Sequence, residues 1–512
     1  MNGRKRLINQ YLSIKLKDTC RNNKLMRTFQ IINNFIYNTH MKIHLVIKTV
    51  LISFITIVVI NPAQSASLLE VYQRALQSDP LIHEAESRRL ASLERETQAR
   101  SRLLPELSVG NRYSVSNFDG SSVEAGASGN VASVSSQSTN ISTGWQIQLT
   151  QTLFQWDRWV GLKQAGKRSA KAEIDYEIQQ QDLIIRVVTR YLNVLAAEDN
   201  LVSINSNKLA IARQLEQAKQ RFEVGLIAVT AVQESQAAYD QSVASEINAK
   251  RSLATARELL REITGAYLPT LDAPDETMPL EFPNPAVEDE WIATAMQQNL
   301  NLISNRFDEE IARHEISYQK TGHYPSLNVV ANMGGQDTDV EDQVRNAINF
   351  PNLSTSNQND SISIQLSIPI YSGGNTSSKV QEAVYLHRAS REKLQRIARE
   401  TEREARDAYL GVTSEISRVK ALKQAVISSK TALQATQAGF EVGTRTIVDV
   451  LNSQFALEAA NQNYAKSRYD YIANVFNLKK SAGTLRVQDL EQFDVWLKER
   501  PSPEEIISKQ DI

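Results

Sequence analysis

The stretch FEVGTRTIVDV occupies residues 440–450, and a near copy, FEVGLIAVTAV, occupies residues 222–232. The two copies lie 218 positions apart and share the opening FEVG. Glycine readily adopts the left-handed conformation that commonly follows the last residue of a helix. Gly225 and Gly443 are therefore predicted to end one long helix each, so that the chain reverses into a shorter helix. The sequence thus predicts the same helical hairpin twice.

The repetition extends through most of the chain. Three further pairs of segments recur in the same order: RLLPELSVG (102–110) and TGHYPSLNVVANMG (321–334), IQLTQTLF (147–154) and IQLSIPIY (364–371), and REITGAY (261–267) and KKSAGTL (479–485). A constant order at a nearly constant offset indicates a tandem duplication. We therefore predict two structural repeats, 67–285 and 286–485, followed by a polar C-terminal tail, 486–512.

Each predicted repeat has one order of elements. It comprises a polar helical stretch (68–104; 289–323), a strand (107–114; 327–333), a loop rich in Ser, Gly and Asn (115–143; 335–360), a second strand, a very long helix (160–223; 377–441) and a shorter helix (228–264; 446–482). A helix over 160–223 is about 96 Å long. Val188, Leu195 and Val202 recur every seven residues, which is coiled-coil spacing. The helices are therefore predicted to form a long tube of antiparallel pairs.

The second strand of each repeat alternates apolar and polar residues, as in SISIQLSIPIY (361–371). Transmembrane barrel strands need about 9–11 residues with this pattern, although a soluble sheet packed on one face produces it too. An export signal at the N-terminus favours the membrane. Four strands cannot close a barrel, so copies must share one. Two copies supply eight strands and three supply twelve, and the residues alone leave both open.

The N-terminus resembles a secretory signal. Residues 41–66 begin with the basic Lys42 and Lys48, continue through an apolar core over 49–60 and end in small residues before position 67. The core is too short to span a bilayer comfortably, which favours a cleaved signal peptide over the alternative, an uncleaved anchor. Residues 1–40 are then a wrongly assigned start or an extension.

Composition restricts the function classes. Residues 1–66 carry ten Lys/Arg and one Asp/Glu, so their removal shifts the net charge from −1 to −10, which argues against a nucleic-acid partner. Cys20 is the one cysteine, and GxxxxGK, HExxH and GxSxG motifs are absent. We therefore predict no enzyme, cofactor or metal site. An exported enzyme and a periplasmic coiled-coil scaffold or adaptor without a pore remain the competing interpretations.

Over residues 68–490 the chain resembles the TolC family of outer-membrane channel proteins. The segments that carry the resemblance are RSRLLPELSVG, IQLTQTLF, RFEVGLIAVTAVQ, LREITGAYLP, GHYPSLNV, LSIPIYSGG and GFEVGTRTIVDVL. The resemblance implies a homotrimer with a twelve-stranded barrel in outer-membrane lipid and a helical tunnel in the periplasm. It also implies a passive exit duct for drug efflux or type I secretion, docked to a periplasmic adaptor and to an inner-membrane pump of the RND, ABC or MFS type.

The resemblance also implies a closure network at the tip of the tunnel. Arg445 matches the family arginine that bonds to a Thr-Asp pair in the first hairpin, where this chain has Thr230 and Ala231. The position of a bonding tyrosine holds Phe440, which has no hydroxyl group. The network is therefore expected to be weaker than in the family.

The family constricts its pore with two rings of aspartate. This chain has Asp449 at the first position and Asn452 at the second, so half of the acidic charge is absent. Three nearby acids could compensate: Glu223, Glu234 and Glu441. Thr446 and Asp449 also have the spacing of a helix capping box, which explains the aspartate without a pore and is compatible with the ring.

Overall fold

The computed structural model describes residues 65–125, 131–275 and 277–510. All of them belong to one compact unit, Ser65–Ile512. The predicted extension, 1–40, lies outside the described residues, as does the signal peptide, 41–66, apart from its last two positions.

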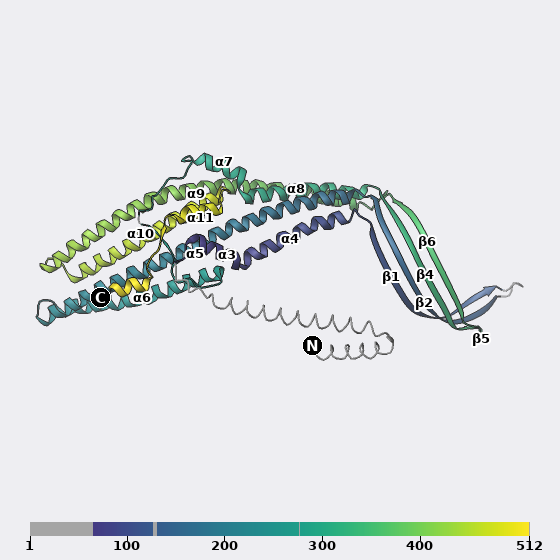
Figure 1. Cartoon of the computed structure of the whole chain (residues 1–512), viewed down its shortest axis with the longest axis horizontal. Coiled ribbons are helices and arrows are strands. Elements are labelled where there is room, and N and C mark those ends of the chain that lie inside the picture. Colours follow the sequence, from purple (N-terminus) through teal and green to yellow (C-terminus); the bar gives the residue numbers. More distant parts are fainter. Residues whose placement is uncertain (1–64, 126–130, 276, 511–512) are drawn as a thin grey trace, which may run out of the picture. The chain divides into compact units, whose positions relative to one another are not determined.

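Two very long helices, α5 (Trp156–Glu223) and α9 (Asn375–Glu441), contain 68 and 67 residues. At 1.5 Å per residue each is about 100 Å long. They reverse into α6 (Val229–Thr264) and α10 (Ile447–Ser481), within a few residues of the predicted bounds. Figure 1 shows the four helices side by side, with both turns at one end. The two predicted helical hairpins are therefore confirmed.

The predicted seven-residue seam of α5 is buried only in part. Val188 and Leu195 are buried, whereas Val202 is half-buried. A straight helix has 3.6 residues per turn, so a strict seven-residue row drifts around its axis. Ile204 and Ile211 occupy the buried side farther along.

The stretches 68–104 and 289–323 are each broken once, so the prediction of a single helix in each was wrong. The first contains α3 (Leu68–Ser78) and α4 (Pro80–Ser101), and the second contains α7 (Glu288–Gln298), α8 (Leu300–Lys320) and a short 3₁₀ turn, η1 (Thr321–His323). The Asp79 side chain accepts a hydrogen bond from the Leu81 N–H at 3.2 Å, and Asn299 accepts one from the Leu302 N–H at 3.0 Å. These side chains cap the second helix of each pair, which separates it from the first.

The sheet is antiparallel, and its main strands lie in the order β1-β2-β4-β6. Its members are β1 (Glu106–Ala125), β2 (Val131–Phe154), β4 (Ser326–Arg345), the short β5 (Ile348–Asn349) and β6 (Leu353–Ser367). The predicted loops 115–143 and 335–360 are largely strand, which corrects the sequence interpretation. The Ser, Gly and Asn residues of these segments have weak intrinsic β propensity. Continuous pairing, from Glu106 with Thr150 to Ala125 with Val131, extends the strands through them.

The strand predicted over 361–371 ends early, at Ser367. Pro369, which lacks an N–H donor, lies two residues beyond this end. Among the residues that the structure describes, β1 and β6 each pair on one side only. Both edge strands expose apolar side chains, including Val109 at 74 % and Ile362 at 81 %.

The largest apolar core lies where the long helices meet the segments before and after them. Leu68, Tyr191, Ile263 and Leu490 are all buried within it. The predicted C-terminal tail, 486–512, folds here: it contains α11 (Val487–Asp494), β7 (Leu497–Lys498) and α12 (Pro503–Gln510), and β7 pairs with β3 (Ala273–Pro274). Among the described residues, no helix contains an apolar stretch that is long enough to cross a membrane.

Candidate functional site

The first hairpin turn is closed by main-chain bonds. Helix α5 ends at Glu223, and Gly225 follows with φ +78°. The Gly225 N–H donates to the Phe222 carbonyl at 2.8 Å, and the Leu226 N–H donates to the Arg221 carbonyl at 2.8 Å. These bonds satisfy carbonyls that the helix end leaves open, so this turn needs no polar side chain.

The second turn has the same glycine and more polar contacts. Gly443 has φ +79°, and the N–H groups of Thr444 and Arg445 both donate to the Gly439 carbonyl, at 2.8 and 3.1 Å. The Thr444 hydroxyl donates to the same carbonyl at 3.0 Å. A Cβ at Gly439 would lie 2.7 Å from Arg445 Cγ, so the missing side chain at position 439 gives Arg445 its room. Gly225 and Gly443 therefore both have left-handed backbone just after the end of a long helix.

Helix α10 starts with a capping box. The Asp449 N–H donates to Thr446 Oγ1 at 3.3 Å, and the Thr446 N–H donates to Asp449 Oδ2 at 2.9 Å. The Thr446 hydroxyl also donates to this carboxylate, at 2.9 Å. The backbone and side-chain hydrogen bonds from Thr446 lower the pKa of Asp449, and the positive charge of Arg445 lowers it further. Asp449 is therefore a carboxylate at neutral pH.

A small apolar cluster joins the two hairpins near their turns. It is formed by buried residues, with partly buried residues around them: Ile211, Leu433, Ile447, Val450 and Leu451, with Ala231, Ala238, Tyr239, Phe440 and Leu457. The Arg221 guanidinium lies over the Phe440 ring, 4.8 Å from its centroid. This contact joins the end of the first long helix to the end of the second.

The residues of the expected closure network are only partly brought together. Ala231 and Phe440 pack in the small apolar cluster, whereas Thr230 and Arg445 are exposed. Within the described part of this single chain, the Arg445 guanidinium forms no ion pair or side-chain hydrogen bond. Asn452 is also exposed. The three proposed compensating acids are exposed as well: Glu223, Glu234 and Glu441.

Asp449 and Asn452 lie on one side of α10. They are three residues apart, which places them on neighbouring positions of one helix face. The opposite face contributes Val450 and Leu451 to the cluster between the hairpins. The two candidate constriction residues therefore project away from the apolar contact.

Farther from the turns, the contact between the hairpins becomes polar. Asn207 of α5 donates from Nδ2 to Glu458 Oε2 of α10, and Gln462 donates to Glu458 Oε1 at 2.9 Å. Burial raises the pKa of Glu458, and these two hydrogen bonds only partly offset it. Nearby, Glu246 accepts from Lys208 and Lys250, both at 2.8 Å. Burial alone would raise the pKa of Glu246, but the two lysines lower it.

Arg221, Asn207 and Glu458 were not predicted from the sequence. Arg221 directly precedes the first FEVG copy, and Phe440 opens the second. The duplication therefore marked where each of the two long helices ends. It did not show that Arg221 and Phe440 contact each other across the two hairpins. Asn207 and Glu458 are single polar residues on long helices, where an exposed position is the usual expectation.

Comparison with known proteins places this geometry in a family. The model of the family "Outer membrane efflux protein" matches residues 71–266 and again residues 291–484. Outer membrane protein TolC of Vibrio cholerae is 37 % identical over 435 residues, which is 84 % of this chain and 94 % of that protein. The alkaline protease secretion protein AprF of Pseudomonas aeruginosa is 27 % identical over 84 % of this chain and 87 % of its own length.

A solved structure shows the same fold at low identity. The outer-membrane channel CmeC of Campylobacter jejuni superposes with a TM-score of 0.65 at 15 % identity, covering 84 % of this chain and 90 % of its own. The family match spans both hairpins and the strands before them. The chain belongs to the outer membrane efflux protein family.

Proposed function

We propose that this protein is the outer-membrane exit duct of an energised transport system, serving efflux or type I secretion. The proposal is supported by the family and by relatives that are channel and secretion proteins rather than enzymes. The observation that carries it is the sheet. Among the described residues, its two edge strands, β1 and β6, each have one edge without a partner strand, and both expose apolar side chains. Such edges are stable in a bilayer only after they pair with other strands.

Three copies close the barrel in this proposal. Each chain supplies β1, β2, β4 and β6, and β1 of one copy pairs with β6 of the next, which gives twelve strands. The helical hairpins then form the periplasmic tunnel, four helices from each copy. The two repeats, 67–285 and 286–485, are supported by the two separate matches of the family model.

The hairpin turns form the gate of this tunnel. Threefold repetition places three Asp449 carboxylates around the axis, where like charges focus a negative potential. Asn452 lies beside them and adds no charge. Arg445 is exposed and forms no ion pair with the described residues of its own chain, so it is free to reach Thr230 or an acid of a neighbouring copy. Phe440 holds the two hairpins of one chain together.

The energy for transport comes from partners. The protein docks onto a periplasmic adaptor and an inner-membrane pump, as its relatives in secretion and efflux imply. Among the described residues, no group of three or more His, Cys, Asp or Glu could hold a metal ion. In this proposal the chain contributes the passage and its gate.

Cross-linking between copies tests the barrel. We would introduce Val109→Cys on β1 and Ile364→Cys on β6 and treat membranes with bifunctional maleimides of increasing length. Covalent trimers on a denaturing gel, absent from either single variant, are expected. Covalent dimers as the end product, or monomers from folded double-cysteine protein in outer membranes, would overturn the shared twelve-stranded barrel.

A further inference from the structure

The sheet-side ends of the helices carry exposed cations that the proposed duct does not use. Four of them, which we call the collar, are Arg102, Lys163, Lys320 and Lys379. Arg102 directly follows α4, and Lys320 is the last residue of α8. Lys163 and Lys379 lie in the first two turns of α5 and α9, each of which follows a strand. Chain continuity alone therefore places all four within about 11 Å of the helix ends next to the sheet.

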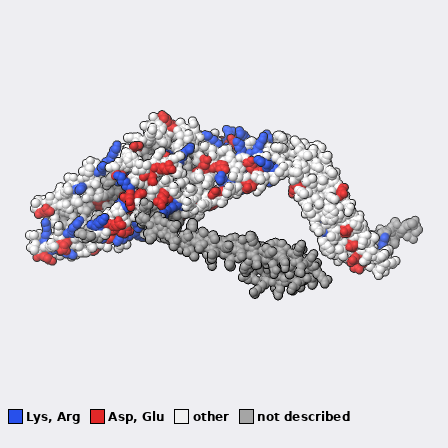
Figure 2. Space-filling model, in the orientation of Figure 1, with Lys and Arg blue, Asp and Glu red and all other residues white. Residues whose placement is uncertain are grey.

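The collar cations are exposed and have no ion-pair partner among the described residues. Among the acids beside them, Glu106 and Glu382 are exposed and form no ion pair within the described residues, whereas others are occupied. Glu96 pairs with Arg100 at 3.6 Å, and Glu315 accepts hydrogen bonds from Gln164 and Gln319, both at 2.7 Å. Figure 2 shows Lys and Arg gathered on the helices some way back from the sheet, and a sheet surface that is largely uncharged beside the helices and carries some Asp and Glu toward its far end.

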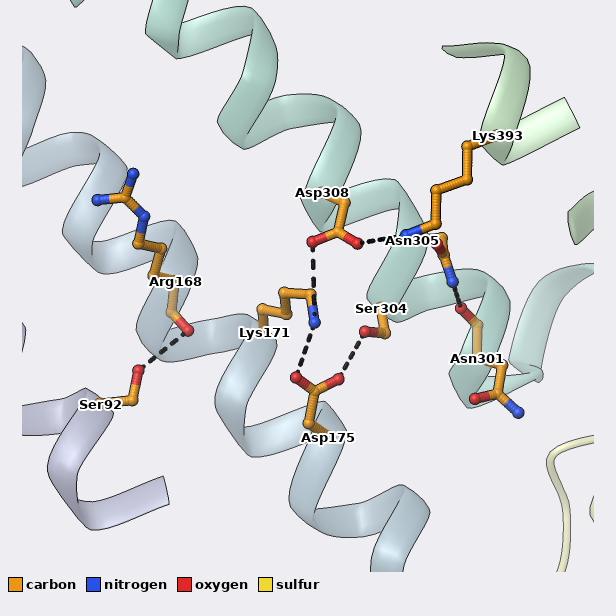
Figure 3. A network of polar contacts seen from close by, with 9 residues as sticks. All are labelled: Ser92, Arg168, Lys171, Asp175, Asn301, Ser304, Asn305, Asp308 and Lys393. Carbon is orange, nitrogen blue, oxygen red and sulfur yellow. Dashed lines mark hydrogen bonds and ion pairs between the residues drawn. The ribbon is translucent and has the colours of Figure 1, made fainter. Parts of the chain in front are cut away.

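Some cations farther along the same helices are paired. Lys171 of α5 bonds to Asp175 at 2.8 Å and lies 3.7 Å from Asp308, which also pairs with Lys393 of α9 at 3.1 Å (Figure 3). Lys167 pairs with Glu310 at 2.7 Å. Other exposed cations of the helical part, such as Lys219 and Lys423, form no ion pair among the described residues either, so the collar is distinguished by its place beside the sheet and by the aromatic side chains near it.

Exposed aromatic side chains lie between the collar and the sheet. They occupy the junctions where strands become helices: Phe154, Trp156, Trp159, Tyr324 and Tyr371. Trp and Tyr are enriched at membrane–water interfaces, because one part of each ring is apolar and another forms hydrogen bonds. Along the chain, apolar strands are followed by aromatic rings and then by exposed cations. This order matches the path from the bilayer core through the interface to the headgroups.

We propose that the collar binds anionic phospholipid headgroups in the membrane leaflet that faces the helices. The proposal rests on the proposed function, because it requires the strands to lie in the outer membrane. An ammonium or guanidinium group attracts a phosphate within a Debye length, about 8–10 Å at ordinary ionic strength. The collar thereby fixes the depth of the sheet in the bilayer and places the long helices outside it.

Quenching by brominated lipids tests the proposal, because the tryptophans at the junctions report their nearest lipids. The full-length exported chain is reconstituted into phosphatidylcholine vesicles that contain brominated phosphatidylglycerol or brominated phosphatidylcholine. We expect the anionic lipid to quench at lower mole fraction, by about fivefold for each cation that binds it, and 1 M salt to abolish the difference. A variant with all four collar residues changed to Gln is expected to lose the preference.

A matched control changes equally exposed cations far from the sheet. Lys219, Arg251, Lys420 and Lys423, also three lysines and one arginine, are all exposed, and changing them to Gln is expected to keep the lipid preference. Equal quenching by the two lipids in the unchanged protein overturns the proposal. So does collar-dependent sedimentation with purified peptidoglycan without a lipid preference, which would assign the collar to the cell wall. If neither lipid quenches folded protein, the strands lie outside the bilayer and the proposed function itself fails.

Discussion

The Arg221 guanidinium lies 4.8 Å from the centroid of the Phe440 ring and thereby connects the ends of the two long helices. Phe440 has no hydroxyl group, so it forms no side-chain hydrogen bond there. The ring instead packs in the small cluster between the hairpins. A cation over an aromatic face contributes about 0.5–1 kcal/mol at an exposed site. The turns are therefore joined by an apolar and cation–π contact.

Phe440→Ala is expected to loosen the two hairpins at their turns. The change removes the ring contact and part of the cluster, which together correspond to about 1–2 kcal/mol. Amide hydrogen exchange near the turns is predicted to accelerate by about five- to thirtyfold, while exchange in the central core stays unchanged. Phe222→Ala is the matched control, because Phe222 is the equivalent residue of the first turn and lies outside the cluster. Equal acceleration in both variants would contradict the asymmetry.

Thr446→Ala is expected to destabilise the first turn of α10. It removes the side chain that accepts from the Asp449 N–H and donates to the Asp449 carboxylate, and loss of such a cap costs about 1 kcal/mol. Exchange of the first α10 amides should quicken accordingly. Thr446→Ser keeps the hydroxyl and should behave like the unchanged protein, and a defect as large as that of the alanine variant would show that the hydroxyl is not the cause.

Acid should weaken the same turn. The folded-state pKa of Asp449 is lowered by its hydrogen bonds to Thr446, so its contribution is complete above the ordinary pKa of an aspartate, about 3.9. It is lost as the pH falls through the lowered folded value. Exchange at the start of α10, corrected for its intrinsic pH dependence, should stay constant above about pH 5 and quicken below about pH 4. Quickening that begins near neutral pH would contradict this assignment.

Glu458→Gln and Glu246→Gln should have opposite effects. The raised folded-state pKa of Glu458 means that its ionisation opposes folding above that pKa, so the glutamine variant is expected to keep or raise Tm at pH 8. The lowered pKa of Glu246 means that its charge stabilises the fold at neutral pH, so Glu246→Gln should lower Tm at pH 8. Thermal unfolding of the two variants at pH 5 and pH 8 measures both. A fall in Tm of equal size for both at pH 8 would contradict the difference in environment.

The helices and turns could be predicted from sequence because each carries its own local signal. Gly225 and Gly443 mark the turns, and the apolar rows of α5 mark a long amphipathic helix. The breaks at Asp79 and Asn299 were missed, although both are good helix N-caps, because the surrounding residues favour helix on either side. An Asp or Asn inside a helical pattern can also be an exposed residue of one uninterrupted helix, so it does not by itself indicate a break.

The strands were predicted too short for the opposite reason. The segments from Val115 to Ala125 and from Gly335 to Arg345 consist largely of polar and charged residues and contain one glycine each, so they give little local signal for a strand. Their pairing partners are fixed by register from the apolar segments nearer the helices. Hydrogen bonding to the neighbouring strand therefore extends each strand through segments whose own residues do not favour strand structure. The Arg221–Phe440 contact escaped prediction because it depends on how two hairpins pack, which the residues around either turn do not encode.

Whether the start of α10 lines and constricts a passage is best decided by single-channel conductance with ion selectivity. The protein and two variants are measured in planar bilayers: Asp449→Asn, which removes the charge and can still cap, and Asn452→Asp, which restores a second acid on the same helix face. Thr446→Ala is the control that breaks the cap and keeps the charge. We predict a cation-selective conductance that weakens in Asp449→Asn, strengthens in Asn452→Asp and persists in Thr446→Ala. Selectivity unchanged in both charge variants would place Asp449 away from the constriction and leave it a helix cap.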